Sequence, residues 1–173
     1  MQIRLLNPGD AAGYHMLRLH GSQEAPDAFD LTYEEEQQQT LQEVAARLQS
    51  QGDPAHHFVL GAFDEDKTLV GTAGLTRETA SKMQHKAIIW GVYISPAVRR
   101  RGIAHALLSE ILEQARKLPG LEQAHVGIVA SNKKAHRFYA SLGFQSYGVA
   151  PRSMRLGTIY LDEELMLFSL YPQ

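Results

Sequence analysis

Apolar and polar residues alternate along this chain in two periods, which together predict a series of strands and helices. Short apolar runs at 3–5, 57–63 and 69–76 are typical of strands, and the polar residues 64–67 between the last two predict a hairpin. The run 87–94 is almost continuously apolar, as expected of a strand buried on both faces in the middle of a sheet.

A longer period of about 3.6 residues marks the predicted helices. It appears at 33–51 and 104–118, where apolar residues recur three and four positions apart, and the turn at 7–10 can cap a further helix over 11–20. Residues 21–32, between the helices expected at 11–20 and 33–51, read as a loop, and Gly-Asp-Pro at 52–54 predicts the end of the helix over 33–51.

The last third of the chain predicts one more helix and three strands. Residues 123–130 have a strand pattern, and a short helix capped by Ser131 or Asn132 is expected to end at Gly143 in a left-handed conformation. Two further strands are expected near 144–149 and 160–170. With 173 residues and neither an internal repeat nor a linker, the chain is expected to form a single domain, residues 1–173.

Charge and composition exclude several function classes. The formal net charge of −2 argues against a nucleic acid as a partner. The chain has no cysteine, which excludes disulfides, thiolate metal ligands and a cysteine nucleophile. The eight histidines follow no ligand spacing, so no metal is expected. No signal-peptide segment opens the chain and no apolar run approaches the ~20 residues of a membrane span, so we expect a cytoplasmic location without membrane contact.

The stretch Arg99–Ala104 carries the clearest chemical signal. It links the central strand to a helix, and the first N–H groups of a helix lack partners and attract anions. Gly102 allows a phosphate to approach the backbone closely, and the neighbouring arginines attract a polyanion. The patterns of the ATP-binding phosphate loop and of the dinucleotide fold are both absent.

A second motif lies about thirty residues further on. Asn132 and Tyr139 are seven positions apart, which places them on nearly the same face of the expected helix. Read without the first motif, Asn132 is only a helix cap and Tyr139 a core residue.

Together the two motifs resemble the GNAT N-acetyltransferase superfamily. Arg99-x-x-Gly102-x-Ala104 is similar to its acyl-CoA pyrophosphate signature Gln/Arg-x-x-Gly-x-Gly/Ala, and Asn132 to Phe144 resembles its Asn-(x)6-Tyr…Gly-Phe block. The resemblance implies an α/β fold with a central mixed sheet of six to seven strands and about four flanking helices. Its two central parallel strands, 87–94 and 123–130, are expected to splay apart around the cosubstrate.

The resemblance also implies an acetyl-CoA-dependent N-acetyltransferase that moves the acetyl group directly to an amine, without a covalent acyl-enzyme. Tyr139 is expected to protonate the departing thiolate. Asn132 is expected to bind the pantetheine or to order its helix. The other expected acetyl-CoA contacts are Val92, Tyr93, Ile94, Arg99, Arg100, Arg101, Gly102, Ile103, Ala104 and His105.

The general base is the point at which the chain departs from the family pattern. The family positions that often carry a glutamate are occupied by Ile88 and Gly127. The substitutes to be weighed are Glu78, His85, His125 and the run Glu34–Glu36, which otherwise reads as the solvated face of its helix. A site without a strong base favours acceptor amines of low pKa. The reason is that an α-amine is roughly 30% neutral at pH 7.4, whereas a lysine is only about 0.1% neutral.

The acceptor itself is left open among a small amine, a peptide N-terminus and a protein lysine. Phe29, Tyr33 and Tyr160 are aromatic candidates for its site, with core packing as the alternative for each. A non-catalytic acyl-CoA-binding regulatory domain on the same fold is the competing function, and the oligomeric state is left open, a homodimer included.

Overall fold

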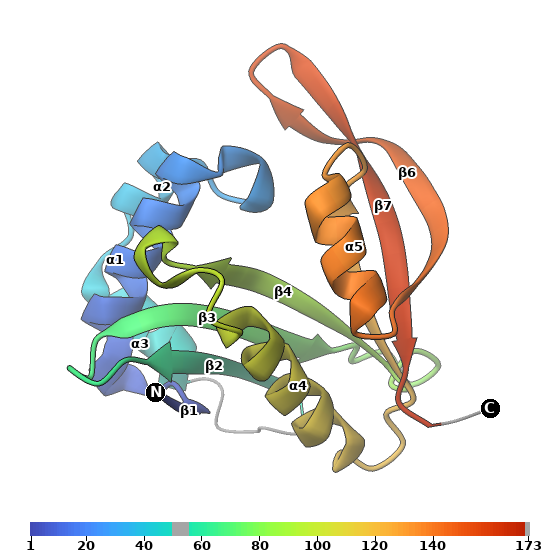
Figure 1. The fold of residues 1–173 in the computed structure, drawn as a ribbon, viewed down its shortest axis with the longest axis horizontal. Coiled ribbons are helices and arrows are strands. Elements are labelled where there is room, and N and C mark those ends of the chain that lie inside the picture. The colour runs from blue at the N-terminus through green and yellow to red at the C-terminus, as the bar shows by residue number, and fades with distance from the viewer. Residues whose placement is uncertain (50–55, 172–173) are drawn as a thin grey trace.

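The computed structural model describes residues 1–49 and 56–171, which form one seven-stranded mixed sheet with helices on both faces (Figure 1). The strands lie in the order β1-β2-β3-β4-β5-β7-β6. Their bounds are β1 Gln2–Leu5, β2 His57–Phe63, β3 Leu69–Arg77, β4 Lys86–Ile94, β5 Gln123–Val129, β6 Gln145–Leu156 and β7 Ile159–Ser169. The helices are α1 Ala11–Glu24, α2 Tyr33–Gln37, α3 Leu41–Gln49, α4 Ile103–Arg116 and α5 Lys133–Ser141.

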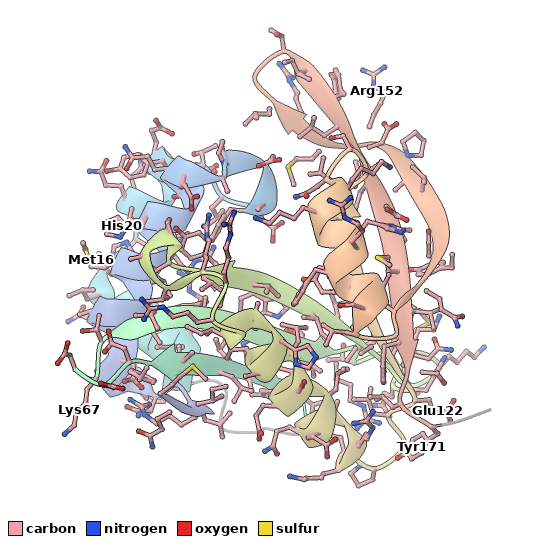
Figure 2. The ribbon with its side chains drawn as sticks, in the orientation of Figure 1. Met16, His20, Lys67, Glu122, Arg152 and Tyr171 are labelled. Atoms are coloured by element: carbon pink, nitrogen blue, oxygen red, sulfur yellow. The ribbon has the colours of Figure 1, made fainter. Side chains whose placement is uncertain are left out.

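Two cores lie on opposite faces of the sheet. The larger contains the apolar stripe of α4, with Leu107, Leu108 and Ile111 fully buried against β2, β3 and β4. α5 packs on the edge of this core through Phe138 and Tyr139. The smaller core lies under α1 and α3 on the other face. Figure 2 shows Met16 and His20 of α1 pointing away from the sheet, as expected of an amphipathic helix.

The sheet departs from regular pairing where the two central strands meet. β4 and β5 are parallel, but their pairing extends only from Lys86↔Gln123 to Ile88↔His125. All other neighbouring strands are antiparallel. The remaining two thirds of β4 therefore separates from β5, and the expected fold class, with its splayed parallel pair, is confirmed.

The first helix is longer than its pattern predicted. α1 continues through Gly21 to Glu24, and the stretch expected to be a loop begins only at Ala25. Gly21 does not end the helix because the ring of Phe29 packs directly on it, and a Cβ at position 21 would collide with that ring. A tertiary contact thus overrides the weak helix propensity of glycine.

The expected single helix over 33–51 is two helices. α2 begins at the Thr32 cap and ends after Gln37, and α3 begins at Leu41. The break has a local cause, since the Thr40 hydroxyl accepts the N–H of Glu43 and the Glu43 carboxylate accepts the N–H of Thr40. This pair of bonds is a capping box, which starts a new helix. The expected helix end at 52–54 lies outside the described residues.

The C-terminal strands form a long hairpin, in which β6 extends well beyond the expected 144–149 and β7 matches the expected 160–170 to within one residue at each end. β6 is irregular between Ala150 and Met154, where its register against β7 shifts. In the part of the chain that the structure describes, no helix has the length and apolar character needed to cross a membrane.

Candidate active site

The separation of β4 from β5 is assisted by a bulge in β4. Thr72 pairs with Tyr93 and Gly74 with Trp90, so that Gly91 and Val92 together face a single residue of β3. Gly91 has a φ of +61°, a left-handed conformation that glycine adopts without strain. The bulge turns the end of β4 away from β5, and β4 does not pair with β5 beyond Ile88.

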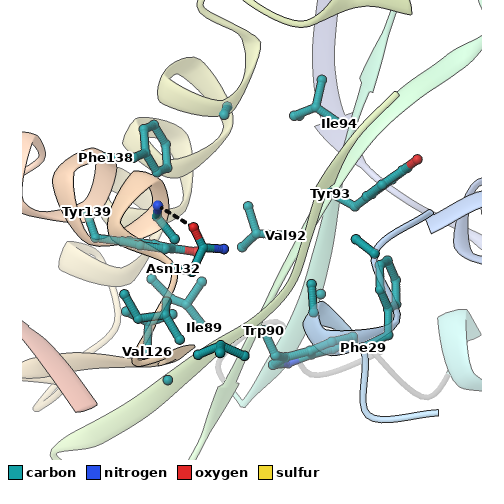
Figure 3. Close-up of a pocket in the computed structure, with 18 of the residues that line it drawn as sticks. Phe29, Ile89, Trp90, Val92, Tyr93, Ile94, Val126, Asn132, Phe138 and Tyr139 are labelled. Carbon is teal, nitrogen blue, oxygen red and sulfur yellow. Dashed lines mark hydrogen bonds between the residues drawn. The ribbon is translucent and has the colours of Figure 1, made fainter. Parts of the chain in front are cut away.

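A cavity of about 1210 Å³ occupies the resulting V. This volume exceeds that of an ordinary small-ligand pocket and provides room for two substrates. Figure 3 shows Asn132 and Tyr139 on one side of β4 and Phe29 and Tyr93 on the other, with Val92 between them. The expected site residues that line the cavity are Val92, Tyr93, Ile94, Arg99, Arg100, Gly102, Ile103, Ala104, His105, Asn132, Tyr139 and Phe29. Arg101, Tyr33 and Tyr160 do not line it.

The loop before α4 contains two residues with left-handed backbone conformations. Arg100 and Gly102 have φ values of 64° and 77°, and α4 begins after Gly102 without a side-chain cap. A Cβ at Gly102 would meet no atom within 4 Å, so the space in front of the helix is open. The first N–H groups of α4 therefore face a free volume, and the helix dipole adds partial positive charge there.

Arg99 is engaged within the protein rather than projecting freely. Its guanidinium forms two hydrogen bonds with Glu24 at the end of α1, and its Nε donates to the carbonyl of Ile94. The Tyr93 hydroxyl also donates to Glu24, at 2.9 Å. Burial and this hydrogen bond raise the pKa of Tyr93 to about 12, so the hydroxyl stays a donor. These contacts tie α1 to the end of β4 beside the cavity.

Asn132 and Tyr139 lie on α5 at the cavity wall. The Asn132 side chain accepts the N–H of Ala135 at 3.0 Å, which makes it the cap of the helix and leaves its amide nitrogen available (Figure 3). The Tyr139 ring is 5% exposed and packs edge-on against Phe138 and Phe144. Burial raises the pKa of Tyr139, so its hydroxyl holds a proton throughout the working range of pH. Both the packing role and a chemical role fit this position.

The substitutes for the general base that the sequence suggested lie away from the cavity. Neither Glu78, His85, His125 nor any residue of Glu34–Glu36 lines it. His125 contacts the Tyr147 hydroxyl and the Gln123 amide, each at 3.1 Å. Glu36 also corrects the view of its run as a solvated face, because it is fully buried and pairs with Arg18 at 2.9 Å.

Several titratable side chains that the sequence analysis did not name as candidates line the cavity, among them His57 of β2, Glu163 of β7 and the carboxylates of Asp27, Asp30 and Asp162. The His57 ring stacks on Trp90, and its Nδ1 lies 2.7 Å from Oγ1 of Thr76. Burial lowers the pKa of His57 and favours its neutral form. Residues 162–164 are three consecutive acidic residues between apolar ones, so the local pattern gives no signal that singles out Glu163.

The side of the cavity under α1 is aromatic and carries one buried cation. Phe29 and Tyr93 meet edge-on with ring centres 5.6 Å apart, and Arg18 lies over the Phe29 ring. Of the three aromatic residues expected at the acceptor site, only Phe29 is on this wall. Tyr160 instead lies under the guanidinium of Arg152.

Among the described residues, no cluster of three or more His, Asp or Glu side chains could hold a metal ion.

Comparison with known sequences identifies a family. The profile described as the acetyltransferase (GNAT) family matches residues 22–144, more than half of the chain. An uncharacterised protein of Mycobacterium leprae is 32% identical over 98 residues. That alignment includes 57% of this chain and only 26% of the mycobacterial protein, so the chain spans about a quarter of its relative's length.

Solved structures share the fold at low sequence identity. The structure of yncA from Salmonella typhimurium with its cofactor acetyl-CoA has a TM-score of 0.83 at 22% identity, covering 100% of this chain and 95% of that one. A GNAT superfamily phosphinothricin acetyltransferase from Sinorhizobium meliloti, in complex with acetyl-CoA, has a TM-score of 0.81 at 21% identity, covering 97% and 87%. At these identities the likeness establishes the architecture.

Proposed function

Since this chain belongs to the GNAT acetyltransferase family, we propose that it transfers an acetyl group from acetyl-CoA directly to an amine. The observation that carries the proposal is the V between β4 and β5, which leads from the uncapped start of α4 to the hydroxyl side of Tyr139. In the proposed function, this one cavity would join the phosphate site to the proton donor.

The cavity offers fitting groups for each part of acetyl-CoA. The N–H groups of Ile103, Ala104 and His105 would bind the pyrophosphate, because Gly102 leaves the space before them open. Backbone groups of Val92, Tyr93 and Ile94 would bind the pantetheine arm along the edge of β4 that faces away from β3, with the Ile94 carbonyl already held by Arg99. Arg99 would act chiefly through Glu24, by holding α1 against the end of β4.

The transfer needs a stabilised oxygen and a proton for the departing sulfur. An N–H group in the bulged segment at Val92 or Tyr93 would donate to the thioester oxygen as negative charge develops on it. Tyr139 would give its proton to the thiolate, and its raised pKa keeps that proton in place until the charge forms. Since the chain has no cysteine, an enzyme thioester is excluded and direct attack by the amine is the simplest route.

The acceptor is proposed to enter on the side of Phe29, opposite α5. This wall combines the aromatic pair Phe29 and Tyr93 with the neutral imidazole of His57. A small amine, a peptide α-amine and a lysine remain open as acceptors, and we propose that the protein works in the cytoplasm.

The test is thiol release from acetyl-CoA across a panel of amines, together with calorimetric titration of acetyl-CoA. We expect binding of acetyl-CoA with the amine absent, and amine-dependent release of one thiol for each acetyl group transferred. Binding without release for any amine would favour the alternative, a non-catalytic acyl-CoA-binding domain. Absence of binding would reject both.

A further inference from the structure

Glu163 takes up a position that the backbone of the neighbouring strand leaves open. A Cβ added to Gly127 of β5 would collide with Oε1 and Cδ of Glu163. The carboxylate of β7 therefore occupies the volume that a side chain at position 127 would fill. Both residues line the cavity, so a carboxylate stands in the wall of the V at a place where β5 itself contributes only backbone.

The face of the sheet on which this carboxylate lies can be read from its neighbours. Val126 and Ile128 belong to the core under α4, so Gly127 between them faces the other way. Glu164 bonds to His136 of α5 at 3.0 Å, so Glu163 also faces away from α5. Tyr139 packs within the core on the α4 side. The Glu163 carboxylate and the Tyr139 side chain thus line the cavity on opposite faces of the sheet.

Glu163 also lies at the wide end of the V. It pairs with Val129, which is four residues beyond His125, where the pairing of β4 and β5 ends. Four residues beyond Ile88, the last paired residue of β4, is Val92 in the bulge. The backbone of Glu163 is therefore level with Val92. Its carboxylate lies over Gly127, two residues beyond His125, and so is nearer the level of Trp90, within the part of β4 that does not pair with β5.

One oxygen of the carboxylate is fixed and the other is available. Ser153, in the irregular part of β6, donates its hydroxyl to Oε2 at 2.8 Å. This is the one side-chain hydrogen bond of Glu163 within residues 1–49 and 56–171. Oε1 lies over Gly127 and keeps its lone pairs for a ligand.

We propose that Glu163 is the catalytic base, and that it accepts a proton from the acceptor ammonium on the face opposite Tyr139. This inference rests on the proposed acetyl transfer. Glu163 takes one proton from R–NH3⁺, and the neutral nitrogen forms a bond to the carbonyl carbon. The C–S bond then breaks, the thiolate takes the proton of Tyr139, and the nitrogen loses its second proton. Tyr139 is reprotonated from that proton or from water, and one proton per turnover leaves Glu163 for solvent.

The assignment has a consequence for the acceptor class. A carboxylate at the wide end of the V attracts a protonated amine and deprotonates it in place, so basic amines become good acceptors. This overturns the preference for amines of low pKa that a site without a carboxylate would impose. We therefore expect strongly basic primary amines, such as a lysine side chain, to be acetylated efficiently.

His57 is a competing group, because burial favours its neutral form and it lines the same cavity, as Asp27, Asp30 and Asp162 also do. Its Nδ1 is engaged by Thr76, which pairs with Ile88 at the narrow end of the V. Trp90 also covers one face of its ring. This geometry suits His57 to packing and hydrogen bonding in the acceptor wall rather than to proton transfer at Val92.

The test compares Glu163→Gln with the unchanged enzyme across primary amines whose pKa runs from about 8, as in a peptide α-amine, to about 10.4, as in lysine. A general base contributes about 10²–10⁴-fold. We expect kcat/KM to fall at least about 100-fold for the most basic amine and less than about tenfold for the least basic. If Glu163 had only a structural role, the substitution would lower kcat/KM for all acceptors by the same factor. Calorimetric affinity for acetyl-CoA and the thermal unfolding temperature should stay near their original values.

Gly127→Ala offers an independent test, because it keeps Glu163 and displaces its carboxylate. The displaced atoms are the far end of a flexible side chain, so the variant should fold. We expect the same amine-dependent loss as for Glu163→Gln, and no further loss when the two are combined. Glu164→Gln is the matched control, since it removes one charge from the same strand on the opposite face, outside the cavity lining, and can still accept from His136.

Each outcome decides the assignment. Unchanged kinetics of Glu163→Gln in an enzyme that acetylates basic amines would overturn the role of Glu163 and leave the proposed function intact. The amine-dependent loss appearing in His57→Gln instead would move the base to His57. Failure of the unchanged protein to release thiol with any amine would reject the proposed function, and the base with it.

Discussion

Arg99 and Glu24 are 75 positions apart in the chain and form a two-point ion pair at the mouth of the cavity, with N–O distances of 2.6 and 2.5 Å. The pair joins the C-terminal end of α1 to the segment between β4 and α4. Because Arg99 also bonds to the carbonyl of Ile94, it holds the end of the bulged strand in place. An arginine that the sequence assigned to phosphate thus has an internal structural partner.

The ion pair predicts a pH-dependent contribution to stability. Hydrogen bonds from Arg99 lower the pKa of Glu24 in the folded state. Its stabilisation is therefore present above the unfolded pKa of about 4.3 and is lost as the pH falls through the lower folded value. Both side chains are more than a third exposed, so after solvent screening Glu24→Gln should cost no more than about 1 kcal/mol at pH 7.

Urea denaturation of the unchanged protein and of Glu24→Gln at pH 7 and pH 2.5 measures this effect. The difference between the two should shrink at the lower pH and in 1 M salt. A difference that stays constant with pH would mean that the hydrogen bonds to Glu24 contribute nothing through its charge.

Gly102 allows backbone strain and anion binding to be separated. At a φ of 77°, Gly102→Ala should cost about 1–2 kcal/mol of stability, with no steric clash. Gly102→Asp adds a negative charge in front of α4 and should weaken acetyl-CoA binding severely, whereas Arg99→Ala should weaken it less. Calorimetry on the folded variants checks this order, and equal affinities for the alanine and aspartate variants would argue against a phosphate site here.

The buried pair of Arg18 and Glu36 gives a prediction on stability. The Arg18 side chain is 11% exposed and the Glu36 side chain 1% exposed. Removal of one member of such a pair leaves an uncompensated buried charge, so Glu36→Ala should destabilise the fold by about 3–5 kcal/mol. The double variant Arg18→Met, Glu36→Leu should lose much less. Guanidinium denaturation of the three proteins would contradict this account if the double variant were the least stable.

Local patterns predicted most of the helices and strands, because the apolar residues within each element recur with a clear period. The splayed parallel pair came from the family resemblance and was confirmed. The errors have tertiary or capping causes. α1 passes through Gly21 because Phe29 covers it, and α3 starts anew because Thr40 and Glu43 cap each other.

The same distinction between local patterns and tertiary contacts applies to the candidate site. The loop at Gly102 and the helix of Tyr139 are each formed by one continuous stretch of sequence, so a sequence motif can locate each of them. Glu163 reaches the cavity only because β7 pairs with β5 beside the bare backbone of Gly127. A contact made between strands far apart in the chain leaves no local spacing to read. The pairing of Arg99 with Glu24 escaped prediction for the same reason.

Tyr139→Phe separates the two roles that fit Tyr139. The substitution keeps the buried ring against Phe138 and Phe144 and removes only the hydroxyl. General-acid catalysis contributes about 10²–10⁴-fold, or roughly 3–5 kcal/mol of barrier height. We expect the variant to remain folded, to bind acetyl-CoA almost normally and to lose at least about tenfold in kcat, since water can replace part of the acid.

The size of the expected loss in kcat depends on the acceptor amine. A thiolate is itself a fair leaving group, so a very basic amine can reduce the need for the acid, and kcat should be measured with several amines. Single-turnover kinetics shows whether the chemical step limits the rate. Because the pKa of Tyr139 is raised by burial, its ionisation should not appear in the pH profile below pH 10. A near-original kcat for every acceptor, with chemistry limiting, would leave Tyr139 as a packing residue only.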